Sequence, residues 1–462
     1  MPMNTHSFDL ITSGDACPRR CAMVRGIITV FALFASILAL APAARCQQLT
    51  RVERDLAEAM LQNISSDVHK YYFDPKLAGL DWDTLVRQTK LKIDQASNMT
   101  VANAEIEALL ENLADSHTVF LPPRNLVTAD YGWKFQIIGK RTFVTEVSPK
   151  SDAEKQGVHP GDEVLTLDGY AVDRAGIPRL QYAMNVIPQN SLKVSLRDPS
   201  GKTRDLDLAA KLTHHPPVLG LGDSTWFINQ QRINGEDAWD KAKSKYKEFG
   251  PELMILRIPQ FAETRVDVEN LIKKARTHKT LIVDLRGNPG GRVDSVADFL
   301  SGVFNRDVKV GKAVQRDKSQ SWEIKSSRKG SFEGDLIVLV DSVSASGAEI
   351  FARVVQLEER GTILGDHSSG RVMEAQIYTH HYGQSPFYIF GDEVSVADTV
   401  MSDGKSLEGV GVKPDRTSLP TAADLAAGRD PVLAYAASLA GVTLSPEDAA
   451  KLFPKPKPTP EE

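Results

Sequence analysis

The chain has 462 residues, of which 42% are hydrophobic and 25% are charged. These values are typical of globular proteins, and the length allows about two or three domains. A formal net charge of −5 excludes the basic footprint that nucleic-acid-binding proteins carry. All three cysteines lie within the first 46 residues, so the remainder of the chain has no disulfide, thiol nucleophile or thiolate metal ligand.

The N-terminal residues have the pattern of a secretory signal peptide. An apolar run over residues 26–44 follows three arginines and ends in small residues. We expect residues 1–46 to form this signal, with Met23 as an alternative start, and the protein to be periplasmic or secreted. An uncleaved membrane anchor is the alternative, because the run is just long enough to span a bilayer.

Residues 47–125 are expected to form a helical N-terminal region. Charged residues with helical periodicity and few glycines predict helices over 49–72, 81–96 and 100–114. Two consecutive prolines at 122–123 then end the helical pattern.

Residues 126–212 change to short β-like runs separated by turn glycines. The run RTFVTEV, followed by SPKSDAEKQGVHPGDEVLTLDGYAV, resembles a PDZ domain. Such domains bind extended peptides by adding a strand and often capture a terminal carboxylate. The resemblance implies a carboxylate loop at YGWKF, without the usual Gly-Leu-Gly-Phe form, and candidate peptide contacts at Tyr131, Gly132, Trp133 and Phe135. Packing without peptide binding is the alternative.

Residues 213–420 alternate strand and helix patterns, which favours an α/β core. Apolar strand candidates, each leading into a helix pattern, occur at 252–261, 280–291 and 335–341. Hairpins are predicted over 372–400.

Residues 421–462 are expected to hold a C-terminal helix, over 430–441, and a disordered tail rich in Pro, Lys and Glu.

The segment DLIVLVDSVSASGAEI, residues 335–350, joins a buried strand to an amphipathic helix through a turn of small residues. A serine at such a junction can present its hydroxyl, and free amides at the helix start favour an oxyanion. Ser346 is therefore a candidate nucleophile. Taken alone, the serines of this turn are more commonly turn or cap residues.

Three other segments supply partners for this serine. Gly290 and Gly291 follow a strand in LRGNPGG, and their amides could form an oxyanion hole with that of Gly347. His117 is a candidate general base. Glu408 could orient that histidine, as the acid of a catalytic triad does.

Together these segments resemble the tail-specific, or carboxyl-terminal-processing, family of serine peptidases over residues 55–415. The resemblance implies an α/β fold with a helical N-terminal region, an inserted PDZ-like β domain and a crotonase/Clp-like α/β peptidase core. The Ser/Lys branch of that family has a lysine base where this chain has Arg371. A guanidinium stays protonated and cannot take a proton from serine.

The tricorn-type branch of the family uses a Ser-His pair, a nucleophilic Ser and a Glu in that order. Ser116, His117, Ser346 and Glu408 fit this order. The resemblance therefore implies that His117 is the base and that Ser116 or Glu408 orients it.

The sequence predicts a secreted or periplasmic serine endopeptidase acting on peptides or unfolded proteins, with the PDZ-like domain engaging or gating substrate. Alternatives are an inactive binding protein of the same fold and an envelope scaffold that works through the PDZ-like domain. No nucleic-acid partner is expected. Contact with a membrane is expected only through the signal or anchor segment. The sequence does not specify an oligomeric state.

No metal or organic cofactor is expected. The histidines that occur as adjacent pairs would point to opposite faces of a strand. They are His214, His215, His380 and His381.

Overall fold

The computed structural model describes residues 48–454 except 124–126, 175, 178–179, 181–183, 185–187, 215–242 and 384–387. The predicted signal segment, His215 and the predicted disordered tail lie outside the described residues. Among the described residues, no helix has both the length and the apolar composition to cross a membrane.

Three helices form the N-terminal region, as the sequence predicts. They are α1 (Arg51–Tyr71), α2 (Trp82–Asp94) and α3 (Met99–Leu110), with short 3₁₀ turns at Leu77–Gly79 and Glu111–Leu113. Thr50, Asp81 and Asn98 begin the helices, because each side chain accepts an otherwise unpaired backbone N–H. The apolar helix faces share a core with Phe120, Phe390 and other residues of a neighbouring sheet.

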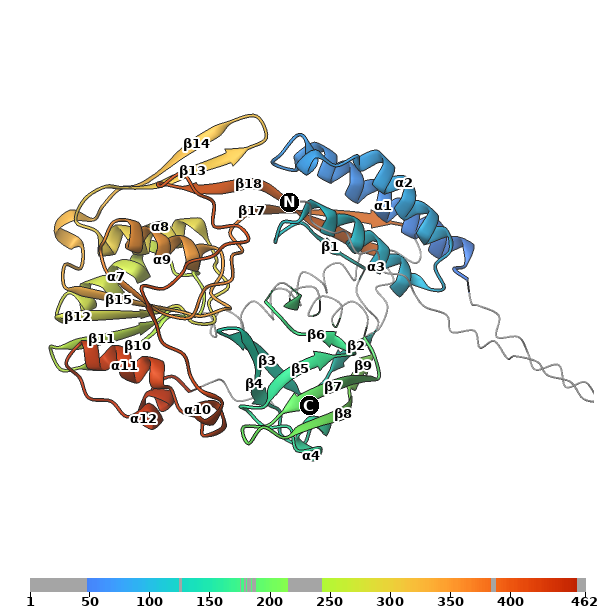
Figure 1. Cartoon of the computed structure of the whole chain (residues 1–462). Coiled ribbons are helices and arrows are strands. Elements are labelled where there is room, and N and C mark those ends of the chain that lie inside the picture. The colour runs from blue at the N-terminus through green and yellow to red at the C-terminus, as the bar shows by residue number, and fades with distance from the viewer. Residues whose placement is uncertain are drawn as a thin grey trace, which may run out of the picture. The chain divides into compact units, whose positions relative to one another are not determined.

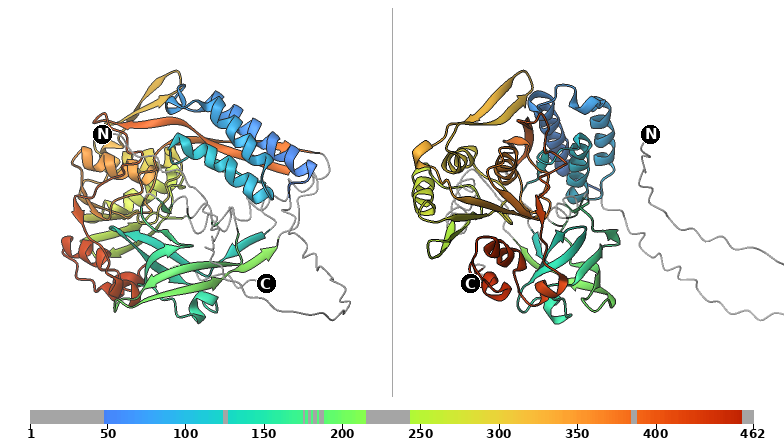
Figure 2. Two further views of the ribbon diagram at one scale, coloured as in Figure 1. Left: turned by 45° about the vertical axis from the view of Figure 1, so that its right-hand side comes forward. Right: turned by 60° about the vertical axis from the view of Figure 1, so that its left-hand side comes forward.

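That neighbouring sheet is built on one long strand. Its members are β1 (Val119–Leu121), β13 (Val308–Gln315), β14 (Ser319–Ile324), β17 (Glu374–Tyr382) and β18 (Tyr388–Met401). β18 pairs with β17 from Tyr388 to Ala397, with β1 over 391–393 and with β13 over 397–401. The long β17–β18 pair runs beside the N-terminal helices (Figure 2). The hairpin predicted from the sequence is therefore confirmed, and it connects two regions of the chain.

Residues 127–214, named here the inserted β unit, form an antiparallel sheet with its own core. Its elements are β2 (Val127–Asp130), β3 (Trp133–Ile138), β4 (Arg141–Val147), α4 (Asp152–Lys155), β5 (Glu163–Leu167), β6 (Tyr170–Ala171), β7 (Ser191–Arg197), β8 (Thr203–Ala209) and β9 (Lys211–His214). The main sheet has the order β3-β4-β5-β7-β8, while β2 pairs with β9 where the chain enters and leaves the unit.

The remaining elements surround a six-stranded sheet, ordered β10-β11-β12-β15-β16-β19. Its strands are β10 (Lys245–Phe249), β11 (Leu253–Arg257), β12 (Thr280–Asp284), β15 (Asp335–Val340), β16 (Thr362–Gly365) and β19 (Arg416–Thr417). Its helices are α7 (Arg265–Ala275), α8 (Val293–Val303), α9 (Gly347–Leu357), α10 (Ala422–Ala426), α11 (Pro431–Leu439) and α12 (Pro446–Lys451), with a 3₁₀ turn at Arg328–Gly330. All pairings are parallel except that of β10.

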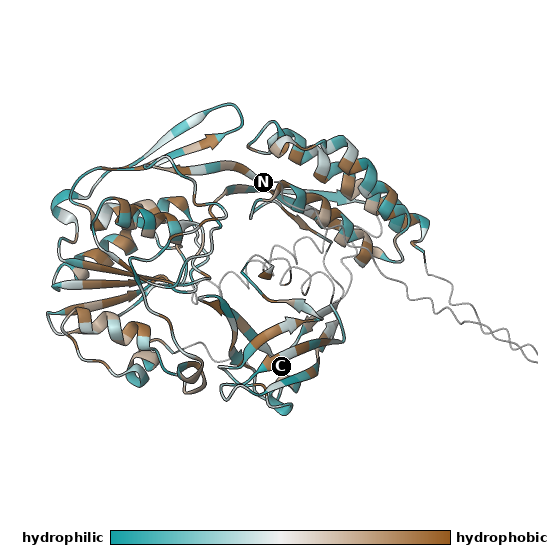
Figure 3. Cartoon of the chain, in the orientation of Figure 1, coloured by the Kyte–Doolittle hydropathy of each residue, from teal (hydrophilic) through white to brown (hydrophobic). Residues whose placement is uncertain are grey.

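Two hydrophobic cores cover the two faces of this sheet. Because successive strand residues point to opposite faces, Val338 packs with α7, α8 and α9, whereas Ile337 and Leu339 pack with α11 and α12. Figure 1 shows these helix groups on opposite sides of the strands, and Figure 3 shows the continuous apolar colour of the strands between them. A parallel sheet buried on both faces accounts for the uninterrupted apolar runs in the sequence.

The parallel order brings three loops to one edge of the sheet. β12, β15 and β16 end, respectively, in the LRGNPGG turn, the turn that holds Ser346 and the loop that leads to Arg371. Ligands of open α/β sheets bind at this carboxyl edge.

Replacing Phe299 by Ala should lower the free energy of unfolding by about 3–5 kcal/mol, because it leaves a cavity in the α8 core. Phe299 is 1% exposed and its ring meets that of Phe261 edge-on at 5.7 Å. Urea unfolding measures the change. Val293→Ala on the same helix is the control, since Val293 is 53% exposed. An equal effect of both variants would contradict this assignment of the core.

Candidate active site

Ser346 lies in a sharp turn between β15 and α9. Its backbone has φ 52° and ψ −118°, a left-handed conformation that non-glycine residues adopt only under strain. Ser346 is the N-cap of α9 and forms the capping-box arrangement with Glu349, but within the described residues its hydroxyl has no recorded hydrogen bond of ordinary geometry. Ser346 thus caps α9 through its backbone and Glu349, and its strained conformation is a feature that capping alone does not require.

A buried carboxylate holds this turn in place. Glu349, one turn into α9, is 0% exposed. It accepts hydrogen bonds from the amides of Ser346 (3.2 Å), Gly370 (2.7 Å) and Arg371 (2.8 Å) and from the Ser368 hydroxyl. Burial raises the pKa of Glu349, and these donors oppose that rise. The carboxylate thereby joins the serine turn to the loop after β16.

The LRGNPGG turn lies directly against the serine. A Cβ on Gly290 would come within 2.7 Å of Ser346 Cβ and 3.0 Å of Gly347 N, so only glycine allows this approach. The Gly290 amide already donates to Asn288 Oδ1 at 2.7 Å. Within the described part of the chain, no acceptor is recorded for the amides of Gly291 and Gly347. Of the three predicted oxyanion donors, the Gly291 and Gly347 amides therefore stay candidates, whereas the Gly290 amide is already paired.

His117, Ser116 and Glu408 lie together. Ser116 Oγ is 2.8 Å from His117 Nδ1, and the Ser116 amide donates to Glu408 Oε1 at 2.8 Å. Glu408 Oε2 accepts from the Val372 amide at 2.9 Å. Glu408 thus contacts the histidine segment through Ser116 and not through the imidazole.

Arg371 connects the serine and histidine segments. Its carbonyl accepts the Ser346 amide at 2.6 Å, and its guanidinium donates to the Ser116 carbonyl at 2.8 Å. Among the described residues, no hydrogen bond joins Ser346 Oγ to His117 directly. The residue that occupies the expected lysine position is therefore a structural bridge between the two segments.

The site keeps the imidazole neutral. Burial and the Arg371 charge lower the pKa of His117 to about 4, against an opposing effect of Asp115. Burial raises the pKa of Glu408, although the Val372 and Ser116 donors oppose it. At neutral pH His117 is thus a proton acceptor.

Sequence reasoning missed three positioning residues. Asp115 Oδ1 accepts the amides of His117 and Thr118 and the Ser395 hydroxyl of β18. Glu349 holds the serine turn, and its spacing from Ser346 matches the Ser-x-x-Glu signature of a helix start, which was the available signal. Asn288 contacts the Ile258 carbonyl and the Gly290 amide.

The predicted peptide contacts of the inserted β unit are largely internal. Tyr131 and Trp133 are 6% and 9% exposed and belong to the core of that unit. Phe135 is partly buried against them. The Gly132 amide donates to Asp130 Oδ1 at 2.8 Å, so this amide is already paired.

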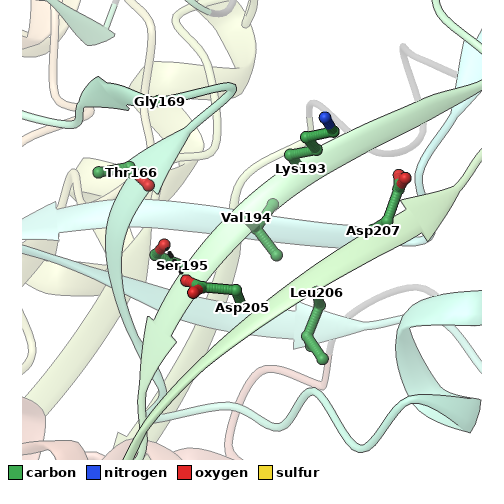
Figure 4. Close-up of a pocket in the computed structure, with 8 residues that line it drawn as sticks. All are labelled: Thr166, Gly169, Lys193, Val194, Ser195, Asp205, Leu206 and Asp207. Carbon is green, nitrogen blue, oxygen red and sulfur yellow. Dashed lines mark hydrogen bonds between the residues drawn. The ribbon is translucent and has the colours of Figure 1, made fainter.

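A depression on the inserted β unit does not contain these catalytic candidates. It lies over β5, β7 and β8 (Figure 4), where the Ser195 hydroxyl donates to the Asp205 carboxylate. Its lining residues are Thr166, Gly169, Lys193, Val194, Ser195, Asp205, Leu206 and Asp207.

The inserted β unit also contacts both loops that hold the serine. Gln136 Nε2 donates to Asp341 Oδ2 at 2.9 Å, at the start of the serine turn. Arg174 donates to the carbonyls of His367 and Ser368, both at 3.1 Å, in the loop that leads to Arg371. The inserted β unit is therefore hydrogen-bonded to the turn before Ser346 and to the loop before Arg371.

Comparison with known proteins relates this chain to known peptidases. Residues 252–418 match the model of peptidase family S41. Carboxyl-terminal-processing peptidase 3 of Arabidopsis thaliana is 22% identical over 399 residues, covering 83% of this chain and 72% of that protein. The tail-specific protease of Haemophilus influenzae is 27% identical over 322 residues, covering 64% of this chain but only 43% of that protein.

A solved structure shares the fold. Mature CPAF in complex with lactacystin matches with a TM-score of 0.59 and 14% sequence identity, over 81% of this chain and 96% of that one. At this identity the match concerns the mixed α/β fold. The similarity to peptidase family S41 is thus carried by residues 252–418, and this chain, with carboxyl-terminal-processing and tail-specific proteases among its relatives, is a serine-type peptidase.

Proposed function

We propose that the protein hydrolyses peptide bonds with Ser346 as nucleophile and His117 as general base. The observation that carries this proposal is the strained turn at Ser346, which Arg371 links to the Ser116–His117 pair. The nearby Gly347 and Gly291 amides have no recorded acceptor among the residues that the structure describes. The linked segments come from distant parts of the sequence, which a turn or cap function of Ser346 would not require.

The proposed reaction follows from the donors and acceptors present. Ser346 Oγ attacks the substrate carbonyl, and His117 Nε2 takes its proton. The amides of Gly347 and Gly291 hold the oxyanion. His117 then gives the proton to the leaving amine, and a water activated by the same imidazole hydrolyses the acyl-enzyme.

Ser116 and Glu408 are proposed to orient the base. With Nδ1–H donating to Ser116 Oγ, the lone pair of Nε2 is available for the serine proton. Glu408 fixes Ser116 through its amide. We expect the contact between His117 and Ser346 to close when substrate binds, as catalytic hydrogen bonds often tighten only in the complex.

Arg371 is proposed to keep the base neutral rather than to act as a base. Its permanent positive charge near His117 disfavours imidazolium. The proposed set of Ser346, His117 and Glu408 corresponds to the Ser/His/Glu arrangement of the tricorn-type branch. It does not correspond to the Ser/Lys arrangement, since Arg371 cannot act as a base.

We propose that the inserted β unit is PDZ-like and gates the site. This proposal is supported by hydrogen bonds from Gln136 and Arg174 to the two loops that hold Ser346 and Arg371, through which a movement of the unit would shift these loops. Peptides and unfolded protein ends are the proposed substrates, and export from the cytoplasm is proposed from the apolar run over residues 26–44.

Ser346→Ala should reduce cleavage of an unfolded protein such as reduced casein by at least about 1000-fold. Ser342→Ala, in the same turn, should stay within about tenfold of wild type, because Ser342 Oγ donates to the Ile137 carbonyl and not to a reacting atom. Peptide release measures both. Absence of cleavage by the wild type would favour an inactive binding protein, and equal losses in both variants would contradict the choice of serine.

Arg371→Gln should move the acid limb of the pH profile of kcat/KM to higher pH. In the wild type the limb should lie well below that of an ordinary histidine, since the pKa of His117 is lowered to about 4. Removing the guanidinium charge raises that pKa, so protonation inactivates the base at higher pH. Arg276→Gln, at an exposed position, should leave the profile unchanged. An unshifted limb in Arg371→Gln would exclude His117 as the base that Arg371 tunes.

Arg174→Ala should lower kcat by about 10- to 100-fold, because loosening the loop before Arg371 misplaces the site. Arg197→Ala is the matched control, since Arg197 pairs with Glu163 inside the inserted β unit at 3.2 Å. Steady-state kinetics with a short peptide separate kcat from KM. If Arg174→Ala and Arg197→Ala both have the kcat of the wild type, the proposal that the inserted β unit gates the site through Arg174 is wrong.

A further inference from the structure

A second cluster of ionisable side chains lies outside the catalytic site. Asp67 comes from the last part of α1, His380 from β17 and Asp392 from β18. His380 Nε2 is 2.5 Å from Asp67 Oδ2 and 3.9 Å from Asp392 Oδ1. One ligand atom from each of the three residues lies within 4.8 Å of the others. The sequence led us to expect no metal at the paired histidines, and Asp67 is distant from His380 in the chain.

Asp392 is a buried carboxyl group for which no hydrogen-bond partner is recorded within the described residues. Its side chain is 0% exposed, and neither carboxylate oxygen has a hydrogen-bond partner within the described part of the chain. A buried carboxylate without donors is strongly disfavoured. Over the same described ranges, His380 is the only side chain recorded as an ion-pair partner of Asp67 and Asp392, and no lysine or arginine pairs with either. Burial and the neighbouring Asp67 carboxyl raise the pKa of Asp392 to about 8, so its two oxygens require either a cation or a proton.

The surroundings hold the three ligands in place. Tyr71 of α1 stacks on Tyr378 of β17 with ring centroids 4.2 Å apart, which fixes the helix against the hairpin. The His380 ring packs against Phe390 with a centroid distance of 5.6 Å. The ligands thus sit on two elements, a helix and a hairpin, whose relative position is already set by aromatic packing.

We propose that Asp67, His380 and Asp392 bind a divalent transition-metal ion, for which Zn²⁺ is the representative. One imidazole and two carboxylates are ligands that Zn²⁺ accepts, and a neutral imidazole with two carboxylates needs two positive charges for balance. Hard ions such as Mg²⁺ prefer all-oxygen sites and keep several waters, so the imidazole disfavours them.

Such an ion would join α1 to the β17–β18 hairpin. On the same strand, Ser395 donates to Asp115, which holds the amide of His117. The Phe73 amide, just after α1, donates to the Ser395 carbonyl at 2.9 Å. The ion is therefore structural, and it stabilises the strand on which the histidine segment rests. The inference stands on its own contacts and does not depend on the proposed peptidase mechanism.

The test uses the full chain after removal of metals with a chelator. Zn²⁺ should raise the Tm of the wild type by a few degrees at concentrations well above its dissociation constant, and Mg²⁺ should not. Co²⁺ should give visible absorption bands from nitrogen and oxygen ligands. Asp392→Asn, which keeps the size of the side chain, should lose both effects, as should His380→Gln.

His381→Ala is the matched control, because the neighbouring strand residue points to the opposite face. It should keep the Zn²⁺ shift and the Co²⁺ spectrum. The proposal is overturned if Zn²⁺ leaves the wild-type Tm unchanged, or if Asp392→Asn responds to Zn²⁺ as the wild type does. An unchanged wild type would mean that Asp67 and Asp392 share a proton instead. Should Asp392→Asn fail to fold, His380→Gln decides.

Discussion

The buried carboxylate of Glu349 is the constraint on which the geometry of the site depends. Ser346 occupies a conformation that costs of order 1–3 kcal/mol and persists only where its surroundings enforce it. Four donors converge on Glu349, and hydrogen bonds to a charged group contribute about 1.5–3 kcal/mol each. Because these donors come from both the serine turn and the Arg371 loop, one side chain fixes the relative position of the two.

The second constraint is the long strand β18. It belongs to the sheet that packs on the N-terminal helices and also pairs with β13 beside the α/β core. Ser395 on this strand holds Asp115, and the chain beyond the strand supplies Glu408. His117 therefore lies between the N-terminal helices and β1, whereas the serine and glycine turns lie at the edge of a different sheet, after β15 and β12.

Local patterns predicted the helices and the buried strands well. Ser346, Gly291 and Gly347 follow strands, and their common position at one edge of the sheet follows from the parallel strand order. Gly290 was also expected to offer its amide to an oxyanion, but that amide donates to Asn288 Oδ1 instead. This hydrogen bond depends on the geometry of the turn, which the sequence alone does not specify. Likewise, Tyr131 and Trp133 looked like binding residues, but their side chains fill the core of the inserted β unit.

Long-range contacts were not predictable from one sequence. The β13–β14 hairpin and its pairing with β18 join segments with no local signal. That Glu408 acts on Ser116, and that Arg371 bridges Ser116 and Ser346, depends on the positions of three loops. The Asp67, His380 and Asp392 cluster has the same origin, because helix and hairpin meet only in the folded chain.

The most direct test of the central claim is the rate and site of phosphonylation by a fluorophosphonate, with the modified residue located by tandem mass spectrometry. A single adduct on Ser346 is expected, with a rate that falls by about 100-fold or more in His117→Ala because the general base is lost. An adduct on a different serine, or equal rates for the wild type and His117→Ala, would contradict the assignment of nucleophile and base.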